Sequence, residues 1–166
     1  GGDFLIRAIR KEDIDTVADI WLATNITTHN FIIPQYWLNN FEPVKKMLSQ
    51  AEIYVFEEEN NIQAFIGLTN DYISGIFVFS EFQSRGIGKQ LLDFVKTIRK
   101  KLSLDVYQKN TRAVKFYQRE GSEIQSKNTD VNTNEEEYTM VWELQPDLSG
   151  TSQSAGQERQ NAQHIV

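Results

Sequence analysis

The sequence predicts an α/β chain of the α+β kind, in which helices pack on a sheet whose strands are mostly neighbours in sequence. Three observations support this prediction. Three apolar runs follow one another between residues 53 and 79, and the polar turn EEENN separates the first two, which is typical of a β-meander. An amphipathic helix pattern begins directly after the third run. A short apolar strand, another helix and two more extended runs complete the pattern.

The N-terminal elements come first. Residues 4–9 alternate apolar with charged or small residues and predict a strand. A helix is expected to open at Lys11, because apolar residues then recur at Ile14, Val17, Ala18, Trp21 and Leu22, on one helical face. The aromatic stretch THNFIIPQYW, residues 28–37, breaks this pattern, and a second short helix is expected over residues 43–50.

The later elements follow the same rules of periodicity and capping. Gly75, inside the third apolar run, predicts a bulge or a close backbone approach. Asn110 is a plausible N-cap, and Gly121 a plausible stop, for a helix over residues 110–120. The segment NTDVNTNEEE, residues 128–137, reads as a polar hairpin loop. The remaining elements are strands over 53–56, 62–68, 72–79, 102–106, 122–125 and 138–144, and a helix over 86–101.

Composition limits the function classes. The 166 residues suit one folded domain, residues 3–144, followed by a Gln- and Ser-rich tail over residues 145–166. The chain has no cysteine and two histidines, so thiolate nucleophiles are excluded and no metal site is expected. Its net charge of −6 disfavours nucleic-acid binding and mildly favours a cationic partner. No stretch has the length of a membrane span, and a cytoplasmic location is compatible with this composition.

The stretch QSRGIG, residues 83–88, lies at the start of the 86–101 helix. The first turn of a helix has N–H groups without intrahelical partners, at the positive end of its dipole, where anions bind well. Gly86 and Gly88 remove side chains that would keep a phosphate away, and Arg85 and Lys89 add positive charge. The pattern predicts a phosphate-binding turn, although a tight, closely packed turn would also use two glycines.

Two common phosphate motifs do not fit this stretch. A Walker P-loop needs Ser or Thr after the lysine, and Gln90 stands there. A dinucleotide fingerprint needs a third glycine where Leu91 stands, and it follows a parallel strand rather than a meander. By elimination, the turn suits another phosphorylated cofactor.

Two stretches together resemble the GCN5-related N-acetyltransferase (GNAT) family. IFVFSEFQSRGIGKQLL resembles its acetyl-CoA-binding motif, and LSLDVYQKNTRAVKFYQREGSEI resembles its second signature. Within the family, HNFIIPQYW together with DVYQKNTRAVKFY looks most like small bacterial acetyltransferases of the YiaC/YjaB type, some of which act on protein amines. The resemblance spans residues 4–144 and implies the GNAT fold: a mixed, mostly antiparallel twisted sheet of about six to seven strands with about four helices.

The resemblance implies an acetyl-CoA-dependent N-acetyltransferase, in which an amine attacks the thioester directly in a ternary complex. The turn at residues 83–89 would bind the pyrophosphate, and N–H groups near Phe77 and Val78 would hold the pantetheine arm and the thioester carbonyl. Asn110 would hold the cofactor arm, and Phe116 would line its channel. The residues expected to bind acetyl-CoA are Phe77, Val78, Gln83, Ser84, Arg85, Gly86, Ile87, Gly88, Lys89, Asn110, Ala113, Phe116 and Tyr117.

The resemblance also gives roles in catalysis. Tyr117 would protonate the leaving thiolate, because a phenol is protonated at pH 7, and Val78 would stabilise the oxyanion. His29 and Tyr72 are candidates for the general base, unless ordered water serves instead. Phe31, Tyr36 and Trp37 form either core packing or the aromatic wall of the acceptor pocket, and the tail would cap the acceptor groove or pair with a neighbouring molecule.

A second functional hypothesis is a catalytically weak module that binds an acyl-CoA as a sensor on the same fold. The amine acceptor stays open between a protein lysine, a peptide N-terminus and a small amine. We expect no nucleic-acid or membrane partner, and a monomer or weak homodimer from a bacterial source.

Overall fold

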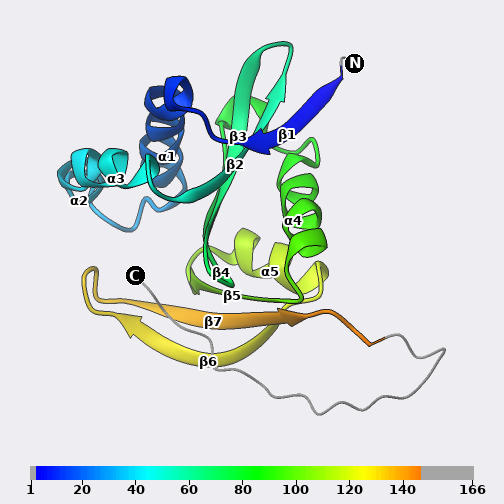
Figure 1. The fold of residues 1–166 in the computed structure, drawn as a ribbon. Helices are drawn as coiled ribbons and strands as arrows, with labels where there is room; N and C mark the ends of the chain where they lie inside the picture. The colour runs from blue at the N-terminus through cyan, green and yellow to red at the C-terminus, as the bar shows by residue number, and fades with distance from the viewer. Residues whose placement is uncertain (1–2, 147–166) are drawn as a thin grey trace.

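The computed structural model describes residues 3–146 (Figure 1). The predicted tail, residues 145–166, lies outside the described residues from position 147 onward. The strands are β1 (Phe4–Ala8), β2 (Glu52–Glu58), β3 (Asn61–Thr69), β4 (Tyr72–Val78), β5 (Lys101–Tyr107), β6 (Glu123–Asp130) and β7 (Glu135–Glu143). The helices are α1 (Ile14–Thr28), α2 (Pro34–Asn39), α3 (Phe41–Leu48), α4 (Ile87–Ile98) and α5 (Thr111–Arg119). Short 3-10 turns, η1 (Lys11–Asp13) and η2 (Ser80–Phe82), precede α1 and α4.

The seven strands form one sheet in the order β1-β2-β3-β4-β5-β7-β6. All neighbouring pairs are antiparallel except β4 and β5, which run parallel. The expected mixed, mostly antiparallel sheet is therefore confirmed. The expected number of about four helices also holds for the longer ones, and the short α2 is an addition.

Two boundaries differ from the sequence-based expectation. Residues 28–37 were expected to break the helical pattern, but α2 begins inside them, because Pro34 occupies a first-turn position where its missing N–H costs nothing. Residues 128–137 were expected to be a loop, but β6 and β7 extend into them and leave a turn at 131–134. Strand β6 is the exposed edge of the sheet, so it carries no apolar alternation by which a strand is recognised.

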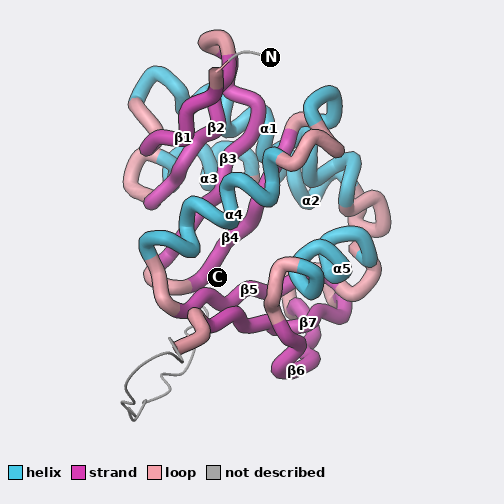
Figure 2. Tube along the Cα trace, turned by 90° about the vertical axis from the view of Figure 1, so that its right-hand side faces the viewer, coloured by secondary structure: helices cyan, strands magenta, loops and turns pink. Residues whose placement is uncertain are grey.

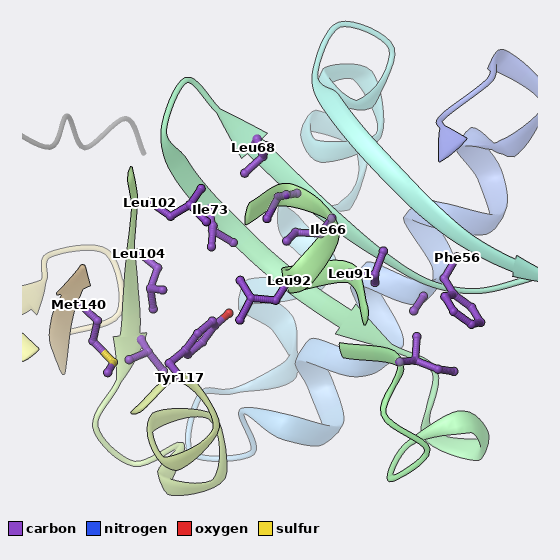
Figure 3. Close-up of a cluster of buried hydrophobic side chains, with 14 residues drawn as sticks. Phe56, Ile66, Leu68, Ile73, Leu91, Leu92, Leu102, Leu104, Tyr117 and Met140 are labelled. Carbon is purple, nitrogen blue, oxygen red and sulfur yellow. The ribbon is translucent and has the colours of Figure 1, made fainter. Parts of the chain in front are cut away.

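Helices cover both faces of the sheet. Alternate residues of β2 and β3 point to opposite faces, so Val55 and Phe65 pack against α1 while Phe56 and Ile66 pack against α4. Figure 3 shows the second of these cores, in which Leu91 and Leu92 of α4 meet the strands and Tyr117 of α5. The core thus fixes α4 and α5 on the same side of the sheet.

Strands β4 and β5 part soon after they meet. Their parallel pairing involves only Tyr72 with Ser103 and Ile73 with Leu104. A register shift between Gly67 and Leu68 leaves Ser74 of β4 without an opposite residue, which is the bulge expected next to Gly75. A bulge bends its strand and increases its twist, so it favours the divergence. Figure 2 shows α4 beside one side of this division and α5 beside the other.

Candidate functional site

A cleft of about 830 Å³ lies where β4 and β5 part. Its walls come from the end of α1, the end of β4, the turn before α4 and helix α5. The structure gathers there most of the site residues that the sequence suggested, although they come from four separate elements. Those lining the cleft are His29, Phe77, Val78, Gln83, Ser84, Gly86, Ile87, Gly88, Lys89, Asn110, Ala113, Phe116 and Tyr117.

The turn before α4 has the backbone conformation of an anion-binding turn. Ser84 and Gly86 both have positive φ angles, of 66° and 81°. The N–H of Gln90 donates to the Gly86 carbonyl, which is the first hydrogen bond along α4. The N–H groups before Gln90 therefore have no intrahelical acceptor. A Cβ on Gly86 would meet nothing within 4 Å, so glycine is required there by its left-handed conformation and not by space.

Gly88 keeps room in the cleft itself. A Cβ added there would lie 3.8 Å from Ile76 and 3.8 Å from Phe116, and both of these residues line the cleft. This first atom would fit, but a larger side chain would extend into the space between β4 and α5. Glycine at this position therefore preserves volume for a ligand.

The charge of the cleft is opposite to that of the chain. The described lining residues include the cations Lys89, Lys109, Arg112, Lys115 and Arg119, and one acid, Glu120. Lys89 forms salt bridges with Asp93 at 3.2 Å and Glu120 at 3.0 Å, which reduce the charge that it offers. Arg85 does not line the cleft, and its guanidinium lies over the Phe82 ring. A positive cleft in a chain of net charge −6 favours an anionic ligand.

The free edge of β4 presents backbone donors to the cleft. The Phe79 N–H bonds to the Gln63 carbonyl of β3, and N–H groups alternate between the two edges of a strand. The N–H of Val78 therefore points toward the side from which β5 has moved away, whereas that of Phe77 points toward β3. The Gln83 side chain donates to the Val78 carbonyl at 3.0 Å, which ties the turn to this strand end.

Tyr117 reaches the cleft from α5 and is 7% exposed. Burial raises the pKa of its hydroxyl, so the phenol keeps its proton at neutral pH. Among the described residues, none forms a hydrogen bond with this hydroxyl. The phenol therefore lines the cleft with its proton in place, where it could donate a hydrogen bond to a ligand.

His29 caps the end of α1 and also lines the cleft. Its Nδ1 lies 3.0 Å from Oδ1 of Asn25, and its Nε2 lies 3.3 Å from Nδ2 of Asn110. Burial lowers the pKa of the imidazole to about 4, so the ring is neutral near pH 7.

Tyr72 does not line the cleft and donates a hydrogen bond to Asp105 at 2.9 Å. Burial and the Asp105 carboxylate raise the pKa of its hydroxyl, so Tyr72 keeps its proton at neutral pH. A phenol in this state is poorly suited to accept a proton from an amine.

A polar face on β5, β7 and β6 is a feature that the sequence did not reveal. Strand alternation and register place Tyr107, Asp105 and Glu137 on one face of the sheet, opposite the face that packs on α5. Burial, with Asp105 and Asp130 nearby, raises the pKa of Glu137 to about 7. The face is close to the cleft, since the ring centroid of Tyr107 lies 5.1 Å from that of His29, which lines the cleft. Glu137 was missed because its segment read as a loop.

The aromatic residues of the segment 28–37 divide between core and surface. Trp37 is 7% exposed and packs edge-on against Trp21, so it belongs to the core. Phe31 is partly buried, with its ring 5.6 Å from that of Tyr107, and Tyr36 is partly buried against Trp37. None of the three lines the cleft at β4.

Two broader features bear on the class of site. No group of His, Cys, Asp and Glu among residues 3–146 could hold a metal ion. No helix in the described part of the chain is long and apolar enough to cross a membrane.

Two comparisons of the sequence with known proteins agree with each other. A family model described as the acetyltransferase (GNAT) domain matches residues 49–121, which run from just before β2 through α5 and include the turn before α4. Peptidyl-lysine N-acetyltransferase YiaC of Escherichia coli (strain K12) is 31% identical over 122 residues, which cover 72% of this chain and 84% of YiaC.

Comparison with solved structures shows the same fold. The solution structure of apo-form YjaB from Escherichia coli has a TM-score of 0.76 at 21% identity and covers 84% of this chain and 97% of that one. The PaiA N-acetyltransferase of Thermoplasma acidophilum, in complex with coenzyme A, has a TM-score of 0.71 at 16% identity, covering 85% and 99% of the two chains.

Proposed function

Because the chain belongs to the GNAT family and is an acetyltransferase, we propose that it moves the acetyl group of acetyl-CoA to a primary amine in a ternary complex. The observation that carries this proposal is the positive cleft beside the glycine turn, in an otherwise acidic chain. When bound, acetyl-CoA would supply the activated acyl group, as a thioester. A structural relative solved with coenzyme A supports this choice of donor.

The residues of the cleft fit the parts of such a donor. The N–H groups at the start of α4, with the cations on α5, would bind the phosphates. Ile76, Phe116 and the space above Gly88 would accept the pantetheine arm. We also propose that Asn110 and Ala113, at the start of α5, contact the cofactor.

The protein itself would contribute a donor to the oxyanion, a proton to the leaving sulfur and a base for the amine. The N–H of Val78 would stabilise the negative charge that develops on the thioester oxygen, an effect worth about 3 kcal/mol per donor. As the new C–N bond forms and the C–S bond breaks, Tyr117 would give its proton to the departing sulfur. The amine would lose its proton to a base, directly or through water.

Because Tyr72 keeps its proton at neutral pH, we propose Glu137 in its place as the candidate base. It lies on the polar face beside Tyr107, and its pKa of about 7 lets it exchange a proton near neutral pH. The same face, with Asp105 and Asp130, would attract a cationic amine. Since YiaC is a peptidyl-lysine N-acetyltransferase, we propose protein lysine side chains as the acceptor class.

The test is release of free thiol from acetyl-CoA in the presence of separate acceptors: a lysine peptide, a peptide whose only amine is its N-terminus, and a polyamine. We expect release with the lysine peptide, together with a mass increase of one acetyl group on that peptide. Binding of acetyl-CoA without thiol release with any acceptor would instead support the sensor hypothesis.

A further inference from the structure

His29 lies in a continuous chain of hydrogen bonds that joins α1 to α5. Asn25 donates its amide to the Trp21 carbonyl at 3.0 Å and approaches Nδ1 of His29 through its oxygen, at 3.0 Å. On the other side of the ring, the Asn110 amide nitrogen lies 3.3 Å from Nε2. The Asn110 oxygen in turn accepts from the Ala113 N–H at 3.2 Å, as the N-cap of α5.

The hydrogen bonds on either side of the imidazole determine which of its nitrogens carries the proton. Because the Asn25 amide nitrogen donates to a carbonyl, its oxygen faces Nδ1, which must therefore carry the hydrogen. Because the Asn110 oxygen accepts from a backbone N–H, its nitrogen faces Nε2, which must accept. A second proton on the ring would place two donors face to face at Nε2.

Aromatic rings hold the imidazole in this position. Trp37 stacks on it with ring centroids 5.6 Å apart, and Phe31 and Tyr107 approach it edge-on at 5.7 Å and 5.1 Å. These rings restrict the orientation of the imidazole and exclude water from part of it. The surroundings therefore favour the neutral ring.

We propose that His29 is a positioning residue, whose Nε2 holds the Asn110 amide and thereby orients the first turn of α5. That helix carries Phe116 and Tyr117 into the cleft, so the hydrogen bond links the end of α1 to the proton donor. Both ring nitrogens are engaged, which leaves none to take a proton from the amine. The inference rests on the proposed function, since Tyr117 acts within that reaction.

Two substitutions separate positioning from simple packing. His29→Phe keeps an aromatic ring between Trp37 and Tyr107 but cannot accept from Asn110. His29→Gln loses the ring, but its amide oxygen reaches about as far as Nε2 and can accept that hydrogen bond. If His29 only packs, the phenylalanine variant should be the more active of the two, and if it positions Asn110 the order should be reversed.

The measurement is kcat at saturating acetyl-CoA and lysine peptide, beside the Tm of each variant. We expect His29→Phe to lose about tenfold in kcat, an effect of the size of one lost hydrogen bond. His29→Gln should recover most of that loss even though its Tm is the lower of the two. A kcat for His29→Phe equal to or above that of His29→Gln would overturn the proposal.

Nuclear magnetic resonance gives a readout independent of turnover. With only two histidines in the chain, ¹⁵N-histidine labelling yields two rings, and His164→Ala assigns them. We expect His29 at pH 7 to be neutral with the proton on Nδ1, and its Nε2 resonance to move in Asn110→Ala. A proton on Nε2 would overturn the inference even in an active enzyme. An inactive wild type with the expected ring signals would instead contradict only the proposed function.

Discussion

The cleft and the polar face beside it are built differently. The donor side consists of the turn at residues 83–89 and the first turns of α4 and α5, which are short continuous stretches that present backbone N–H groups and cations. The proposed acceptor side, on that polar face, collects Tyr72, Asp105, Tyr107 and Glu137 from three strands, beside the rings of His29 and Phe31 from the connection between α1 and α2. In the proposed reaction, local backbone geometry would bind the cofactor, whereas side chains that only the tertiary fold brings together would meet the acceptor.

The largest expected effect is at Tyr117, which lines the cleft from α5. Tyr117→Phe should lower kcat by about 100-fold or more, the usual contribution of a positioned acid, because the leaving sulfur loses its proton donor. Acetyl-CoA affinity should change little, since the proposed proton transfer to sulfur takes place only as the C–S bond breaks. Steady-state kinetics and calorimetry measure the two quantities.

Tyr54→Phe is the matched control for Tyr117. It removes a hydroxyl that bonds to Glu52, away from the cleft lining, so kcat should remain that of the wild type. An unchanged kcat in Tyr117→Phe would remove this residue from the mechanism and leave donor and acceptor sides without a shared catalytic group.

The next largest effect tests the donor side alone. Gly88→Leu should weaken acetyl-CoA binding by at least about tenfold, because its side chain enters the space between Ile76 and Phe116. Helix stability should not fall, since leucine is a better helix former than glycine by about 0.8 kcal/mol. Calorimetric titration with acetyl-CoA measures the change, and Thr97→Leu, exposed at the other end of α4, is the control.

Removal of cleft cations should have a smaller, salt-dependent effect. Arg112→Gln and Lys115→Gln should each weaken acetyl-CoA binding by about threefold at low salt, because an exposed charge contributes under about 1 kcal/mol. The loss should shrink in 0.5 M NaCl, where screening leaves little of the electrostatic term. A loss that does not depend on salt would mean that these side chains act by shape or hydrogen bonding.

The last predictions concern the acceptor side, at Glu137, and begin with the stability of the folded protein. Its folded-state pKa of about 7 lies above the ordinary value, so between about pH 4.5 and 7 the folded chain holds a proton that the unfolded chain has released. Ionisation of Glu137 therefore costs stability as the pH rises. Glu137→Gln should gain Tm relative to wild type at pH 8 and show little difference at pH 5.

The same variant tests the proposed role of Glu137 as a base. In the wild type, kcat/KM should rise with pH through about 7, as the carboxyl loses its proton. In Glu137→Gln this limb should disappear and activity should fall. If the limb stays, another group takes the amine proton, and the acceptor side acts by binding alone.

The sequence predicts the donor side better than the acceptor side. The strands of the meander and the turn before α4 were predictable, because periodicity and the paired glycines at 86 and 88 record local requirements. The role proposed for His29 was not predictable, since its contact with Asn110 joins residues 81 positions apart. Glu137 was not predicted to lie in a strand, because the edge strand β6 and its partner β7 carry charged residues where a buried strand would carry apolar ones.

Aromatic residues show the same limit. Three rings of the segment 28–37 looked equally suited to a core or to a pocket wall. Burial separates Trp37, which is inside, from Phe31 and Tyr36, which are partly exposed. Composition cannot make this distinction, because it depends on where Pro34 restarts a helix and how that helix docks on α1.

The proposed reaction is direct transfer of the acetyl group from acetyl-CoA, bound beside the glycine turn, to a lysine amine. Its most direct test is a single turnover with acetyl-CoA labelled in the acetyl group, first with enzyme alone and then with a lysine peptide. We expect no label on the enzyme and, with peptide, one labelled ε-amine for each thiol released. Label fixed to the enzyme, or thiol released without labelled peptide, would contradict direct transfer.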